Sequence, residues 1–154
     1  MFKALRVITA LLIISIAATP AIACKLGAEA YDLKVFLSSP KPNKVVFLGQ
    51  VKSIENSLKS KERLPTQKIQ FQAERWWHGR AREVVEAEGN VGTLKGTDCE
   101  GVFDFKVEFG EEWLIVGFEE AGTIRPSGLL SKRISNHKLP PEVTQLLALK
   151  NDAH

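Results

Sequence analysis

The sequence is poor in the residues from which most recognisable functional sites are built. Its 154 residues include two cysteines and three histidines, and none of these shows the close spacing of a metal-binding motif. It contains no glycine-rich phosphate-binding loop, and its Lys and Arg residues form no dense cluster, so nucleotide or nucleic-acid binding is not expected. The sequence therefore predicts neither a cofactor nor a bound metal.

Long apolar runs are absent as well, except for one near the N-terminus. Lys3 and Arg6 lead into an apolar run over residues 7–18, and Ala21-Ile22-Ala23 has the small side chains that a signal peptidase accepts. The run is shorter than the about 20 apolar residues that a permanent membrane-spanning helix needs. We therefore expect residues 1–23 to be a signal peptide.

The predicted mature chain, residues 24–154, is expected to be a single domain exported to the periplasm or the extracellular space, without stable insertion in a membrane. Its charge is nearly balanced, because two of the 21 basic residues, and none of the 18 acidic ones, lie in the signal segment. The alternative is a lipid anchor on Cys24. Ala21 argues against it, because lipoprotein processing favours a large aliphatic residue at that position.

Cys24 and Cys99 are the two cysteines, and we expect them to form a structural disulfide because exported proteins meet an oxidising environment. Such a bridge closes a long loop and holds the chain end, which stabilises a fold by about 4–5 kcal/mol in the chain-entropy model. Two free thiols or a metal-binding pair are the alternatives, and the absence of a neighbouring ligand for either cysteine makes them less favourable.

The mature chain is expected to fold mainly as short strands separated by turns, with one helix near each end. One helix is predicted within residues 27–38 and ends there because prolines follow it. The other is predicted over residues 141–150. Branched and aromatic residues predict strands at 45–51, 68–74, 83–88, 113–118 and 123–125, with further alternation at 103–107. Because closure hides sheet edges, this pattern favours a small closed five-stranded barrel of the oligonucleotide/oligosaccharide-binding (OB) type.

Trp76 and Trp77 are a candidate binding surface. Adjacent residues of a strand face opposite sides, so one ring is expected in the core and the other outward or at a rim. An outward tryptophan beside Arg75, His78 and Arg80 would stack on a sugar or a base. The interpretation that we favour is structural, with the second ring covering a loop.

Enzymatic activity is not expected. Ser127 and Ser131 have no general base near them in the sequence. The acidic pairs at 111–112 and 119–120 flank a strand, where like charges are typical of a solvated edge. The sequence therefore favours a protein that acts by binding.

Several segments follow one another in an informative order that begins at the predicted mature N-terminus. They are Cys24, Val45–Val51, Phe71–Gly79 (FQAERWWHG), Asp98-Cys99, Phe105–Gly110 and Trp113–Val116. This order resembles the netrin-type module of the tissue inhibitors of metalloproteinases (TIMPs), in its short bacterial exported form, from Cys24 to about Ser131. The resemblance implies an OB-like barrel and a disulfide between Cys24 and Cys99.

The resemblance also implies a mechanism. In animal members, the α-amino nitrogen and carbonyl oxygen of the first cysteine chelate the zinc of the target protease, and the next residue enters its specificity pocket. These positions correspond to Cys24 and Lys25 here. The chain departs from the family at Leu26, where a second cysteine is usual, and the late-barrel cysteine that would pair with it is also absent. The alternative is a non-inhibitory OB-fold module of the cell envelope that binds protein or glycan.

Overall fold

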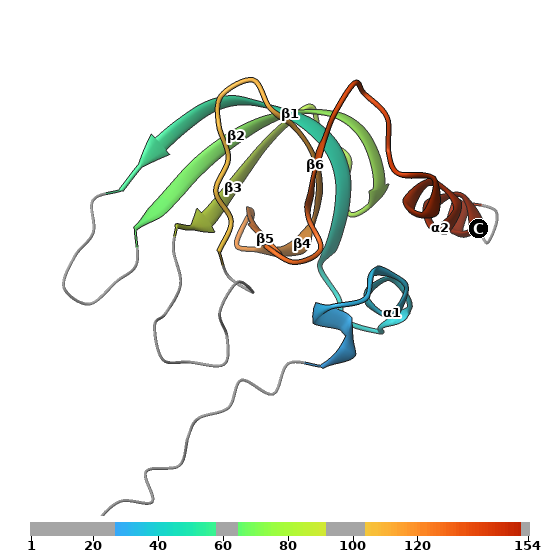
Figure 1. Ribbon diagram of the computed structural model, residues 1–154. Coiled ribbons are helices and arrows are strands. Elements are labelled where there is room, and N and C mark those ends of the chain that lie inside the picture. Colours follow the sequence, from blue (N-terminus) through green and yellow to red (C-terminus); the bar gives the residue numbers. More distant parts are fainter. Residues whose placement is uncertain (1–26, 58–64, 92–103, 152–154) are drawn as a thin grey trace, which may run out of the picture.

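A closed five-stranded barrel forms the centre of the fold in the computed structural model, which describes residues 27–57, 65–91 and 104–151 (Figure 1). The strand order is β1-β2-β3-β5-β4, and pairing of β4 with β1 closes the barrel. The β3–β5 contact is parallel and the other pairings are antiparallel. The strands are β1 (Lys44–Asn56), β2 (Thr66–His78), β3 (Val84–Asn90), β4 (Glu112–Glu120) and β5 (Thr123–Pro126).

The described helices lie near the two ends of the chain, as the sequence predicts. Near the N-terminus, a short 3₁₀ turn, η1 (Ala28–Ala30), precedes α1 (Leu33–Ser38), and α2 (Pro141–Asn151) lies near the C-terminus. None of the helices within the described ranges has the length and apolar character that a membrane crossing requires. The predicted mainly β barrel with a helix at each end is therefore confirmed.

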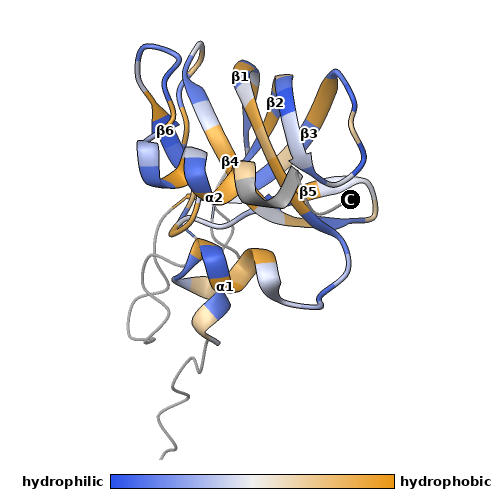
Figure 2. Cartoon of the chain, turned by 90° about the vertical axis from the view of Figure 1, so that its right-hand side faces the viewer, coloured by the Kyte–Doolittle hydropathy of each residue, from blue (hydrophilic) through white to orange (hydrophobic). Residues whose placement is uncertain are grey.

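The sheet is buried on both faces around β1 and β4, which explains their continuous apolar sequences. Alternate residues of the barrel strands build an inner core that includes Phe47, Phe71 and Ile115. The residues between them build an outer core, in which α1 and α2 cover β1 and β4; its members are Phe36, Leu37, Val46, Leu114, Val116, Leu130, Ile134, Val143 and Leu147. Figure 2 shows the apolar stretches of β1 and β4 in orange, with both helices next to the barrel.

Two β-bulges change which residues of β2 face the barrel interior. Ala73 pairs with Gly49 and Arg75 pairs with Leu48, so Glu74 between them is an extra residue with no partner on β1. Trp77 is extra in the same way. A bulge shifts the alternation of a strand by one residue and increases its twist. As a result, Trp76 joins the inner core, where unbroken alternation from Ala73 would place Trp77.

The structure differs from the predicted strands in three places. β1 and β2 are longer than predicted, and a short strand, β6 (Lys132–Ile134), adds to the first half of β4. Residues 105–109 form no strand, although Phe105 and Val107 are buried. The buried side chain of Gln67 holds this segment by accepting a hydrogen bond from Val107 N at 2.9 Å. Hydrogen bonds to the Gln67 side chain therefore take the place of the strand pairing that the alternating apolar residues of this segment predict.

Candidate functional site

The residues predicted to contact a target lie just before the first described residue. Cys24, Lys25 and Cys99 fall outside the described ranges, so the disulfide and the zinc-chelating terminus stay predictions. The structure describes the chain from Gly27, two residues beyond Lys25.

The N-terminal segment is held by local hydrogen bonds and one ion pair. The Gly27 carbonyl accepts a hydrogen bond from Ala30 N at 2.9 Å, which starts η1. Asp32 caps α1, since its carboxylate accepts from the N–H groups of residues 34 and 35. Capping satisfies donors that the first helical turn leaves open and contributes about 1 kcal/mol. Glu29 of η1 also pairs with Lys41, which precedes β1.

Lys44, the first residue of β1, ties the other end of α1 to the barrel. Its Nζ donates hydrogen bonds to the carbonyl oxygens of Phe36 at 3.1 Å and Leu37 at 2.9 Å, and also to that of Ser39. A cation at a helix C-terminus satisfies the open carbonyls and opposes the negative end of the helix dipole. The packing of Phe36 and Leu37 in the outer core completes the attachment.

A cleft of about 600 Å³ opens between this segment and the ends of β3, β4 and β5; we call it the N-terminal cleft. Gly27, Phe36 and Phe118 are among its lining residues, and the two phenylalanine rings contact each other at 5.2 Å between centroids. Arg125 and Glu88, which form an ion pair at 2.9 Å, also line it. The cleft thus has aromatic and charged residues in its lining, beside the point where the described chain begins.

Neither Trp76 nor Trp77 is an exposed ring. Trp76 stacks on Phe47 at 4.7 Å between centroids, and its indole N–H donates to the Arg82 carbonyl at 3.0 Å. Trp77 packs against the outer core, and the Arg75 guanidinium lies 4.8 Å from its ring centroid. Both indoles are half-buried, one on each face of the sheet. The sequence predicts that the two rings point to opposite faces, and they do.

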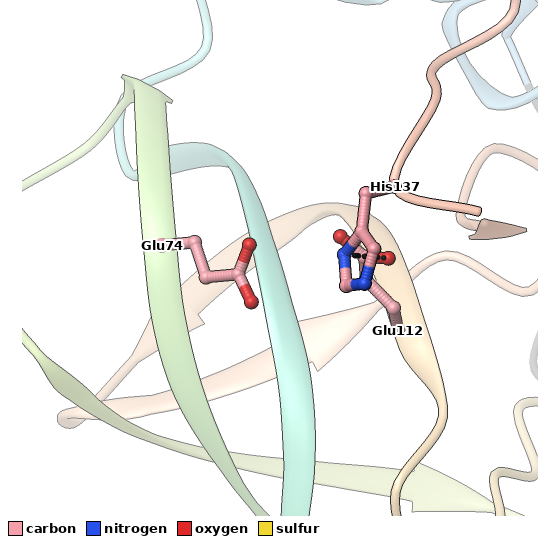
Figure 3. A group of neighbouring side chains, drawn as sticks. All are labelled: Glu74, Glu112 and His137. Carbon is pink, nitrogen blue, oxygen red and sulfur yellow. Dashed lines mark ion pairs between the residues drawn. The ribbon is translucent and has the colours of Figure 1, made fainter. Parts of the chain in front are cut away.

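A group of polar side chains that the sequence analysis did not connect meets on the outer face. Glu74, Glu112 and His137 each offer a ligand atom, and these atoms lie within 4.8 Å of one another (Figure 3). The predicted solvated edge is wrong for Glu112, whose side chain is only 8% exposed. No sequence spacing signals this group, because its members come from β2, β4 and the turn after β6.

The serines weighed as nucleophiles have structural partners. The Ser131 hydroxyl accepts a hydrogen bond from Val116 N and donates one to Val116 O, both at 3.1 Å. The Ser127 hydroxyl accepts from Leu130 N at 3.2 Å. Both side chains thus complete backbone hydrogen bonding around β4 and the following turn.

Comparison with known proteins gives no match: no family model matches the chain, and no curated protein sequence matches it. The resemblance to the netrin-type module therefore stays a prediction. The closed barrel confirms the fold class that the sequence predicts, and it does not test membership of that family.

Proposed function

We propose that this chain is an exported, TIMP-like inhibitor of a zinc metalloprotease that acts through the α-amino nitrogen and the carbonyl oxygen of Cys24. One observation carries the proposal. The N-terminal segment is fixed from Gly27 onward to the end of a closed barrel, beside an open cleft. Order in the segment that follows the chelating residue lowers the conformational freedom that is lost when the terminus enters a protease active site.

The local attachments matter because the chain lacks the second N-terminal bridge of the family. Leu26 replaces the usual cysteine, so a disulfide cannot hold that position. The Asp32 cap and the hydrogen bonds of Lys44 to the end of α1 hold the next segment instead. They support the view that inhibition does not require the missing bridge.

The chemistry of the proposed contact follows from the coordination of catalytic zinc. Such zinc ions keep one position open for water, and the amine and carbonyl of one residue form a five-membered chelate that fills it. The amine must be neutral to donate. An α-amino group has an ordinary pKa of about 8, so zinc displaces its proton at modest cost.

Lys25 restricts the target class. Burying a lysine costs its solvation and about 2 kcal/mol of rotamer freedom, so an apolar specificity pocket would reject it. We therefore expect the target protease to have a polar or acidic pocket at that position. Replacement of Lys25 by alanine should weaken inhibition of such a protease while leaving the barrel unchanged.

The decisive experiment compares two proteins that differ by one residue. One begins at Cys24, and the other carries an additional alanine before it, which converts the chelating amine into an amide. Both are assayed against a panel of zinc metalloproteases, with a serine protease as control. Inhibition by the first protein alone supports the proposal, and equal behaviour of the two against every protease would refute it.

The intact mass of the protein from its own host tests the earlier steps of the proposal. A chain that starts at unmodified Cys24 and gains two hydrogens on reduction would have the free amine and the bridge to Cys99. A diacylglyceryl group on Cys24 would occupy the sulfur and exclude the bridge, and the inhibitor proposal would fall.

A non-inhibitory binding module is the second candidate, and the N-terminal cleft favours it. Phe118 and the Arg125–Glu88 pair in its lining suit a peptide or glycan that presents both apolar and polar groups. In this case the added alanine would leave partner binding intact. Replacement of Phe118, which lines the cleft, by alanine would reduce it.

A further inference from the structure

Three side chains from separate parts of the fold converge on the outer face of the barrel. Figure 3 shows the Glu74 carboxylate pointing across β1 toward Glu112 and His137. β2 and β4 flank β1, so their backbones lie about 10 Å apart. Two long glutamate side chains directed toward each other cover this distance, and their ligand atoms come within 4.8 Å of each other and of the imidazole.

The β-bulge on β2 helps to direct Glu74 to this place. As the extra residue opposite Leu48 and Gly49, Glu74 has no partner in the β1 ladder. Bulges bend a strand, re-aim a side chain and are frequent beside functional sites. The same bulge determines that Trp76 joins the inner core, so the position of Glu74 is fixed by the packing of the barrel.

An unusual turn directs His137. Asn136 and His137 have φ angles of 58° and 53°, two successive left-handed residues neither of which is glycine. Ser135 and Lys138 pair across them in an isolated bridge, as in a type I′ turn. Left-handed backbone is unfavourable for most residues, and it persists where the surrounding structure requires it. Here it brings His137 Nδ1 to 2.9 Å from Glu112 Oε2.

A buried oxygen of the Glu112 carboxylate points to a ligand. Its side chain is more than nine-tenths buried, and its Oε1 has no hydrogen-bond partner among the described residues. Burial of an unsatisfied carboxylate oxygen is costly, and such groups in folded proteins call for an explanation. The ion pair with His137 satisfies only the other oxygen, so a simple structural pair leaves the cost in place.

We propose that Glu74, Glu112 and His137 form a binding site for a divalent transition-metal ion of the zinc type. One imidazole and two carboxylates match the ligand types of Zn²⁺, and three protein ligands leave a position for water. Tetrahedral coordination at about 2.0–2.2 Å requires ligand atoms about 3.3–3.6 Å apart, so small side-chain rotations close the group around an ion. The exposed side chains of Glu74 and His137 provide the entry path from solvent.

The site is independent of the proposed inhibitory terminus. The Cys24 chelate would bind the zinc of another protein, whereas this site would hold an ion of its own on the outer face of the barrel, between side chains of β2 and β4. Its test therefore uses metal binding and needs no protease. Loss of inhibition in one experiment and loss of zinc binding in the other are separate results.

The test titrates Zn²⁺ into chelator-stripped protein that begins at Cys24, in competition with a chromophoric chelator. Glu74→Gln removes one carboxylate at an exposed position, and His137→Asn removes the imidazole while keeping a residue that tolerates left-handed backbone. Glu86→Gln is the matched control, because Glu86 is an exposed glutamate on β3 outside the group. The Co²⁺ spectrum of each protein reports whether thiolate sulfur is among the ligands.

We expect one Zn²⁺ ion per chain, at least about tenfold weaker affinity in Glu74→Gln and in His137→Asn, and unchanged affinity in Glu86→Gln. The wild-type Co²⁺ complex should show nitrogen and oxygen ligands without a thiolate charge-transfer band. Equal affinity in wild type, Glu74→Gln and His137→Asn would overturn the proposal. So would the absence of zinc binding, or a thiolate band that locates the ion at a cysteine.

Discussion

Replacement of Phe36 by alanine should separate the N-terminal segment from the barrel. α1 has six residues, whereas helices shorter than about 12 residues are unstable on their own in water, so its stability comes from packing. Phe36 is 1% exposed, lies in the outer core and contacts Phe118. Removing a buried phenylalanine side chain costs about 3–5 kcal/mol.

Val35 supplies the matched control on the same helix. Its side chain is 38% exposed, and alanine has the higher helix propensity, so Val35→Ala should change stability by no more than about 0.5 kcal/mol. The two substitutions therefore change neighbouring residues of the same capped helix, and the replaced side chains differ mainly in burial.

Urea denaturation measures the global cost, and amide hydrogen exchange locates it. The N–H groups of Phe36 and Ser39, which donate to the carbonyls of Asp32 and Val35, should lose protection in Phe36→Ala. Amides at the centre of β4 should keep theirs if the segment detaches locally. If the inhibitor proposal is correct, potency falls with protection. Equal stability and protection in Phe36→Ala and Val35→Ala would refute the claim that this ring holds the segment.

Three further substitutions test the barrel and its turns. Gly117→Ala would place a Cβ atom 2.2 Å from the Arg125 carbonyl oxygen, so it should separate β4 from β5. The free energy of unfolding, measured by urea titration, should fall by at least about 1–3 kcal/mol. An unchanged urea midpoint would contradict this contact. Ser131→Ala leaves the buried N–H of Val116 without its partner and should lower the free energy of unfolding by about 1–3 kcal/mol, as measured in thermal melts. A loss of stability smaller than that caused by replacing an exposed serine would show that the hydrogen bond is unimportant. Asn136→Val forces a branched residue into left-handed backbone and should lower the free energy of unfolding by about 1–2 kcal/mol. Asn136→Gly should leave stability unchanged or raise it. Similar melting temperatures for the two variants would exclude the described turn.

The architecture could be predicted because its signals are local and repeated. Branched and aromatic clusters locate the five barrel strands, and prolines locate the end of one helix and the start of the other. β6 gave no such signal, because three residues form a strand only where β4 offers a free edge. Residues 105–109 alternate like a strand, yet the Gln67 side chain occupies the hydrogen-bonding groups of Val107.

The Glu74–Glu112–His137 group could not be predicted for a related reason. Its geometry depends on a one-residue bulge at Glu74, and alternation alone does not show where a strand gains an extra residue. It also depends on the left-handed backbone of Asn136 and His137, although asparagine there was the one local signal for such a turn. Spacing along the chain finds metal ligands only when neighbouring residues supply them.

β1 carries both the attachment of α1 and the pairing positions opposite the Glu74 bulge. Lys44 at its start holds the end of α1, while Leu48 and Gly49 lie opposite the bulge that carries Glu74. A strand rises about 3.3 Å per residue, so four to five residues put about 15 Å between these points. Substitutions this far apart without shared partners usually have additive effects. Because the strand lies between two packed cores, we expect substitutions at Glu74 to leave the attachment of α1 unchanged, and substitutions of Phe36 to leave the Glu74–Glu112–His137 group unchanged.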